Sequence, residues 1–183
     1  MKNKLIFSSL VLFIVSLIVL LIFVTPQQIV NMIGIRNVYL FIFAVSFLAG
    51  FSSITSFSMV AILVTFTAGG VNPIIMGIVS GIGLVIGDMI MFFASSKGRK
   101  LATGKFEKSL KKLARLFEGK PKKLIPVLTY LYMGLSPFPN DILLIFLAMI
   151  EYPFKKLYIP MILGDLTYPL AITILATQGL MIL

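Results

Sequence analysis

Residues 124–150 form a strongly apolar stretch that a short polar break, Ser-Pro-Phe-Pro-Asn-Asp at 136–141, divides in two. Eleven residues (125–135) precede the break and nine (142–150) follow it, whereas a helix that crosses a bilayer needs roughly 20 apolar residues. Two prolines and an Asn-Asp pair do not continue a helix. Broken backbone at membrane depth is tolerated only where protein buries it or water reaches it. The stretch therefore predicts a re-entrant helical hairpin whose tip forms part of a site, an arrangement typical of transporters.

The composition indicates a single all-α integral membrane domain over residues 1–183. The chain is 59% hydrophobic and contains no Cys, no His and no Trp. The lack of Cys and His excludes disulfides, thiolate or imidazole metal sites, and the Ser-His and Cys-His nucleophile pairs of many enzymes. We therefore expect a protein that is not an enzyme and that holds neither a metal nor another cofactor.

The positive charge is concentrated in one segment. Eleven of the 16 Lys and Arg residues lie at 97–123, between two apolar regions, which favours a cytoplasmic linker over a nucleic-acid site. Within this segment, apolar and basic residues fall on opposite faces of a helical wheel, which predicts an amphipathic helix at an anionic membrane surface. A linker that only fixes orientation remains the alternative. The basic face consists of Lys105, Lys108, Lys111, Lys112 and Arg115.

The lengths of the apolar stretches predict the topology. Residues 1–24 begin with Lys2 and Lys4 and read as a retained transmembrane helix with a cytoplasmic N-terminus, followed by an external loop to residue 37. Residues 38–70 carry a polar break and predict a first re-entrant hairpin, and 73–96 predict a full crossing. After the basic linker, the second hairpin enters from the cytoplasm. Residues 157–181 then cross outward, with Pro160 and Pro169 expected to kink the helix.

Short internal similarities suggest that the chain is an inverted repeat of a hairpin plus a transmembrane helix. Repeat one covers 38–96 and repeat two covers 124–183. Three matches occur in the same order in both: Ala-Gly-Phe-Ser at 49–52 with Met-Gly-Leu-Ser at 133–136, Asn-Pro at 72–73 with Tyr-Pro at 152–153, and Ile-Gly-Asp at 86–88 with Leu-Gly-Asp at 163–165. Inverted repeats with broken helices are a recurrent plan in transporters. The spacing of Gly77, Gly81, Gly83 and Gly87 predicts close helix packing.

The second hairpin tip offers the strongest candidate site, formed by Ser136, Asn140 and Asp141. Free backbone amides at the start of the following helix favour an anion such as a phosphate headgroup. Asn140 or Asp141 could instead serve only as a helix cap. An acid near mid-membrane is costly and therefore suggests a role in proton or cation coupling. On this reading, Asp141→Asn should fold normally and lose most of its transport.

Two further sets of polar residues are candidates for a binding or coupling site. Asp88 and Asp165 lie inside predicted transmembrane helices, where acids are usually functional. The alternative is that they pair with Lys155, Lys156 or Thr167. The first hairpin tip supplies hydroxyl groups that could complete a polar chamber or could bond to local backbone. These hydroxyls belong to Ser52, Ser53, Thr55 and Ser56.

Three stretches of the chain resemble the DedA/VTT (SNARE-associated Golgi protein) superfamily. They are Thr-Ala-Gly-Gly at 67–70, Ile-Gly-Asp at 86–88 with Lys-Gly-Arg at 97–99, and the 136–141 break followed by Tyr-Pro-Phe-Lys-Lys at 152–156 and Gly-Asp at 164–165. The resemblance implies two facing re-entrant hairpins and movement of lipid between leaflets. Many bacterial members carry an acid in the first hairpin and Arg-x-x-Pro-x-x-Arg in the second. Here the first hairpin has no acid, and Gly134 and Asn140 stand at the places of the two arginines.

Together these features predict a multi-pass transporter or scramblase of a prokaryotic plasma membrane. Its cargo would be an anionic lipid, such as a polyprenyl phosphate or a phospholipid, that passes through a polar chamber between the hairpin tips. Protons or cations would drive it through Asp88, Asp141 and Asp165. A non-transporting membrane scaffold and an exporter of small solutes or ions on the same fold are the alternatives. The sequence predicts membrane lipids and no nucleic acid as partners, and it leaves a homo-oligomer open.

Overall fold

A computed structural model describes residues 25–98, 124–136 and 138–180, and this part of the chain is entirely helical. The predicted first helix and the predicted amphipathic helix, with its five basic residues, lie outside these ranges. The helices are α2 (Pro26–Ile33), α3 (Ile35–Ala49), α4 (Ser53–Ala68), α5 (Pro73–Gly98), α7 (Ile125–Leu135), α8 (Asn140–Met149) and α9 (Phe154–Leu180).

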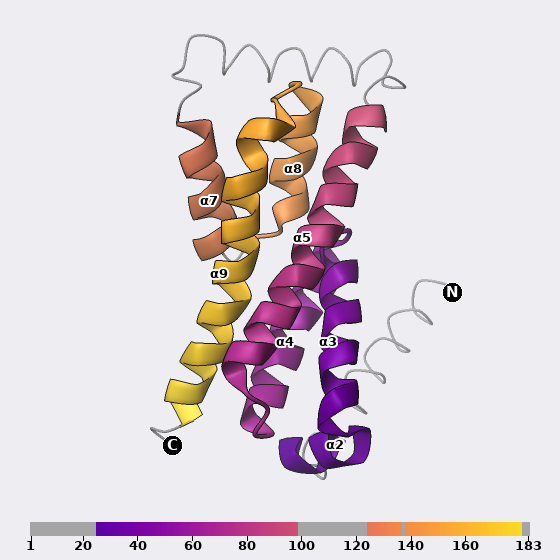
Figure 1. Cartoon of the computed structure of the whole chain (residues 1–183), viewed down its shortest axis with the longest axis vertical. Coiled ribbons are helices and arrows are strands. Elements are labelled where there is room, and N and C mark those ends of the chain that lie inside the picture. The colour runs from indigo at the N-terminus through magenta and orange to yellow at the C-terminus, as the bar shows by residue number, and fades with distance from the viewer. Residues whose placement is uncertain (1–24, 99–123, 137, 181–183) are drawn as a thin grey trace, which may run out of the picture.

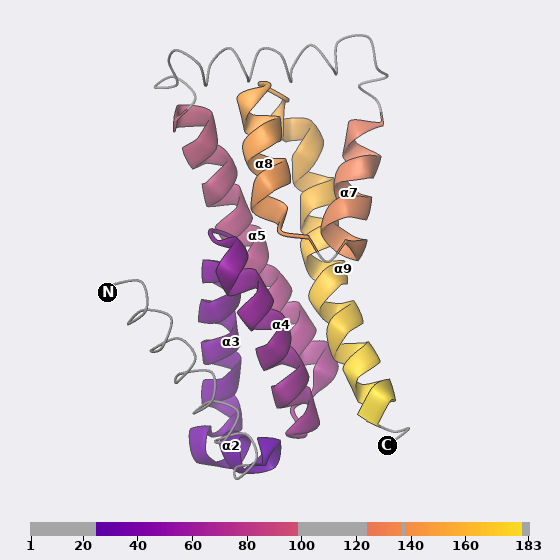
Figure 2. The ribbon, with the colours of Figure 1, turned by 180° about the vertical axis from the view of Figure 1, so that it is seen from behind.

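The two longest helices, α5 and α9, form the axis of the molecule and run in opposite directions (Figure 1). Their 26 and 27 residues correspond to about 40 Å each. Helices α3 and α4 form an antiparallel hairpin beside one half of this axis, and α7 and α8 form a second hairpin beside the other half. The hairpins enter from opposite ends, and their tips face each other near the middle (Figure 2).

Two of the described helices, α5 and α9, are long and apolar enough to cross a membrane. There are three candidates if α2 and α3, which meet at a 99° bend, are counted as one broken span. The expected crossings at 73–96 and 157–181 match these helices within a few residues. Helix α9 continues through both Pro160 and Pro169.

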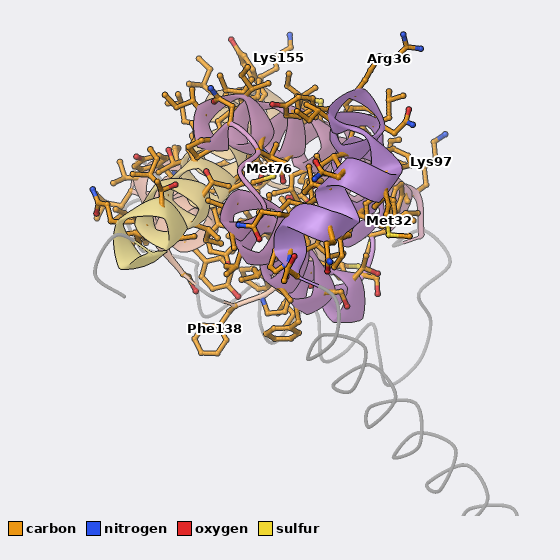
Figure 3. The ribbon with its side chains drawn as sticks, turned by 90° about the horizontal axis from the view of Figure 1, so that it is seen from below. Met32, Arg36, Met76, Lys97, Phe138 and Lys155 are labelled. Carbon is orange, nitrogen blue, oxygen red and sulfur yellow. The ribbon has the colours of Figure 1, made fainter. Side chains whose placement is uncertain are left out.

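The segment expected to be an external loop is helical instead. Thr25 and Gln28 form a capping box, in which the Thr25 side chain accepts from the Gln28 amide and the Gln28 side chain accepts from the Thr25 amide. Pro26 occupies the first turn, where its missing N–H costs nothing. The Gln27 side chain also donates to the Ala68 carbonyl at the end of α4, over 2.8 Å. Helix α2 thus closes the outer end of the first hairpin (Figure 3).

Both hairpins join their long helices through the same kind of turn. After α4, Gly70 has a positive φ of 86°, and the Val71 amide donates to the Phe66 carbonyl. After α8, Glu151 has φ 59°, and the Tyr152 amide donates to the Leu147 carbonyl. These are the bonds of a helix-ending Schellman turn. Proline follows in both cases, at the start of α5 and just before α9.

Candidate functional site

Two buried acids face the middle of the molecule at the same height. Asp88 lies ten residues from the end of α5 at Gly98, and Asp165 lies eleven residues from the start of α9 at Phe154. Because the two helices are antiparallel, both acids lie about 15–17 Å from the same end. Neither has any exposed surface. An acid buried in an apolar interior needs a partner or a proton, because desolvation strongly disfavours its charge.

The partner comes from the tip of the second hairpin. The side-chain amide of Asn140, the first residue of α8, donates to Asp88 Oδ2 and to Asp165 Oδ1, each over 3.1 Å. An amide group has two N–H donors, so one Asn bridges both acids and uses its full donor capacity. One side chain therefore ties the hairpin to both long helices.

The bridge leaves half of the carboxyl oxygens without a donor. Asp88 Oδ1 and Asp165 Oδ2 are buried and have no hydrogen-bond partner. One amide group reaches an oxygen of each acid, so the two carboxyl groups lie close together, but two carboxylates cannot bond to each other without a proton. Lys155 and Lys156, the ion-pair partners considered from the sequence, are exposed and lie at least nine residues away along α9, or about 13 Å. That alternative is wrong for these lysines.

Glycine pairs explain why the acids sit at the hairpin tips. The last turn of α3 contacts α5 so closely that a Cβ on Gly50 would lie 2.7 Å from the Gly87 Cα. In the second half, a Cβ on Gly164 would lie 2.7 Å from the Met133 Cβ and 3.2 Å from the Gly134 nitrogen. In each half, the glycine of the long helix directly precedes the aspartate. The Gly-Asp matches noted in the sequence thus mark equivalent contacts between a hairpin arm and its long helix.

The other glycines of α5 also pack within this chain. Gly83 lies against α3, and Gly77 and Gly81 lie against α9. A Cβ on Gly81 would lie 2.9 Å from the Asp165 carbonyl oxygen. Pro169 has no N–H to offer that carbonyl four residues earlier in the helix. The two long helices are therefore in close contact next to the acid pair.

A small cavity lies beside Asn140, between the two hairpin tips. Its volume is about 20 Å³, enough for one water molecule. It is lined by side chains from both hairpins and both long helices. Exposed Phe57 and Phe138 are at its rim, and Figure 3 shows Phe138 pointing away from the helices. The remaining lining residues are Ser56, Met59, Leu84, Pro139, Asn140 and Tyr168.

The structure places the residues of the second tip in different surroundings. Asn140 joins the acid pair, whereas Asp141 is half-buried and its Oδ1 accepts from the Ile142 amide over 2.9 Å. Asp141 remains close enough to act on Asp88 through its charge. Ser136 accepts from the Phe138 amide over 3.2 Å, within the turn. The Tyr132 hydroxyl donates to the Pro139 carbonyl and holds the turn closed.

The first tip is shorter than the sequence suggested. The non-helical break covers only residues 50–52. Helix α4 already begins at Ser53, so Thr55 and Ser56 lie in a helix. The Ser56 hydroxyl donates to the Ala49 and Ser52 carbonyls, which is the local backbone bonding considered as one alternative, and Ser56 also lines the cavity.

Sequence reasoning missed two contributors, Tyr168 in the cavity wall and the bond from Tyr132 to Pro139. Both depend on how α7 and α9 are oriented around their axes, for which no local motif gives a signal. No protein-family model, curated protein or solved structure matches this chain.

Proposed function

We propose that this chain is a membrane transporter that moves an anionic lipid between leaflets by exposing a chamber between two re-entrant hairpins to each side in turn. The observation that carries the proposal is the Asn140 bridge to Asp88 and Asp165. It places two buried acids where both hairpin tips converge, and intramembrane acids at such points generally mark transport or proton pathways.

The lengths of the hairpin arms support the re-entrant arrangement. Helices α7 and α8 have 11 and 10 residues, or about 15–17 Å each, which is half of a hydrocarbon core of about 30 Å. Arms of this length bring the break between them to mid-membrane. Helices α3 and α4 are longer, with 15 and 16 residues, and α2 lies across their outer end.

Equivalent contacts in the two halves support the inverted repeat. The glycine contacts at the acids and the Schellman turns after α4 and α8 occur at corresponding places, while α5 and α9 run in opposite directions. In such a repeat, exchanging the conformations of the two halves converts an inward-open chamber into an outward-open one. The acids couple this exchange to proton movement in the proposed mechanism.

One observation favours a second candidate, an exporter of a small cation or solute. The described residues that line the cavity include no Lys or Arg, and the nearby acids would repel an anion. A phosphate headgroup would then depend on backbone amides at the start of α8. A cation or a neutral solute needs no such compensation.

Reconstitution in liposomes tests the proposal and separates the candidates. The purified chain is incorporated with a fluorescent polyprenyl phosphate, an anionic phospholipid or a neutral phospholipid, and movement between leaflets is followed by accessibility to a membrane-impermeant quencher. We expect accelerated movement of an anionic lipid, and loss of it in Asp88→Asn and Asp165→Asn. Thr129→Val is the matched control, since Thr129 only bonds to the Ile125 carbonyl of its own helix. If no lipid moves but a cation or solute gradient dissipates, the exporter replaces the lipid transporter.

A further inference from the structure

We propose that Asp88, Asn140 and Asp165 form a binding site for a single proton, and that the bound proton latches the α7–α8 hairpin onto α5 and α9. The inference deepens the proposed function by assigning the residues that bind the proton, the number of protons bound and the element that the proton controls. The proton site itself does not require that function, but the role of the bound proton in transport rests on it.

The geometry supports a site for one proton. Asn140 donates to one oxygen of each acid, and the other two oxygens have no partner. With both acids ionised, two like charges would face each other in an apolar interior. A proton shared between the carboxyl groups removes one charge and provides the donor that the pair lacks, as in other carboxyl pairs at close range. A second proton would find no acceptor left in this arrangement and would weaken the acceptors of the Asn140 amide.

The same three residues connect separate parts of the fold. Asp88 is on α5, Asp165 is on α9, and Asn140 is at the hairpin tip, next to the cavity. Two hydrogen bonds to a singly charged pair are charge-assisted and therefore stronger than bonds to neutral groups. They hold the tip most firmly when the pair carries one negative charge. Loss of the shared proton should release the tip because the two buried negative charges then repel each other. Gain of a second proton should release it because the bonds lose their charge assistance.

The groups around the site leave the acid pair as the main titrating element. Among the described residues, Asp141 of α8, Tyr132 of α7 and Tyr168 of α9 are the other ionisable side chains placed near the hairpin tip. The basic residues of the two long helices, Lys97 of α5 and Lys155 and Lys156 of α9, lie nine or more residues away along those helices. Helices α3 and α4 contribute only hydroxyl groups there, such as Ser46 and Ser56. Asp141 lies close enough to the acid pair to act on it through its charge, so its variant is tested separately below.

Infrared spectroscopy of the wild-type chain tests the proton directly. The chain has three Asp residues, so ¹³C-Asp labelling identifies the carbonyl band of a protonated Asp. We expect a band equivalent to one proton per chain over an intermediate range of pH, and its loss at higher pH. Asp88→Asn and Asp165→Asn should each remove the band over that range, since the new amide supplies the donor. Asp141→Asn should keep it. A wild-type spectrum without the band at any pH above about 4 would overturn the proposal.

A distance measurement tests the latch and needs no cargo. The chain lacks Cys, so spin labels can be attached at Ile90→Cys on α5 and Ile142→Cys on α8, both exposed positions. We expect the narrowest distance distribution at intermediate pH, and broader ones toward acid and alkali. Asn140→Ala should keep the infrared band but give a broad distribution at every pH, and Asp88→Asn should lose only the alkaline broadening. An unchanged distribution in Asn140→Ala would refute the latch. Narrowing by Na⁺ at fixed pH, without the infrared band, would replace the proton with a metal cation.

The two tests are separable from the proposed function. An infrared band and a pH-dependent distance in a chain that moves no lipid would leave the proton site in place and refute the lipid transporter. Lipid movement without the band would do the reverse.

Discussion

Gly164 is the position at which one added methyl group should have the clearest effect. An alanine Cβ there would lie 2.7 Å from the Met133 Cβ and 3.2 Å from the Gly134 nitrogen, whereas carbon atoms in favourable contact are about 3.5–4.0 Å apart. Helix α7 would have to move away from α9 by up to about 1 Å. Overpacking of this kind typically costs about 1–3 kcal/mol.

Gly179→Ala is the matched control, because Gly179 lies in the same helix and a Cβ there would meet nothing within 4 Å. Both variants gain helix propensity of up to about 1 kcal/mol, so the difference between them isolates the packing term. We expect Gly164→Ala to be less stable than Gly179→Ala by about 1–3 kcal/mol. The measurement is the free energy of unfolding in mixed micelles of increasing SDS fraction. Equal stability of the two variants would show that α7 does not pack on α9 at this glycine.

Two further predictions concern the long helices. Thr173→Val removes the hydroxyl that donates to the Pro73 carbonyl of the other long helix, over 2.9 Å. It should lower the free energy of unfolding in mixed micelles by about 0.6 kcal/mol, the average for such bonds in membrane proteins. No change would mean that Thr173 bonds only within its own helix. From the positive-inside rule we expect the end with Lys97, Lys155 and Lys156 to face the cytoplasm. Lys155→Cys should then react with an impermeant maleimide only in inverted vesicles, and Gly179→Cys only in intact cells. The opposite pattern would reverse the orientation.

The sequence predicted the elements that depend on local chemistry. The apolar lengths and the prolines at 137 and 139 gave both long helices and the second hairpin, because chain breaks in an apolar stretch leave few alternatives. The helix at 26–33 was missed although Thr25-Pro26 and Gln28 are recognisable start signals. The helix was missed because the segment was judged by its few apolar residues, whereas its start is fixed by a capping box of polar residues.

The site was harder to predict because it depends on rotation about a helix axis. Successive residues on a helix point about 100° apart, so Asn140 can face both acids while its neighbour Asp141 does not. The sequence favoured Asp141 because a charged group near mid-membrane is costly and therefore suggests a function. The bridge instead needs a neutral group with two N–H donors, which Asn140 supplies. Only the register of α8 against α5 and α9 distinguishes the two.

The shared depth of Asp88 and Asp165 has an electrical consequence. The acids lie about two-fifths of the way along the axis from the basic end, so in a membrane a proton arriving from the opposite side crosses about three-fifths of the voltage. A full crossing corresponds to about 2.3 kcal/mol per 100 mV. A potential of that size, negative at the basic end, therefore favours proton entry from the opposite side by about 1.4 kcal/mol, or roughly tenfold. Voltage alone, without any difference in pH, would then load this site.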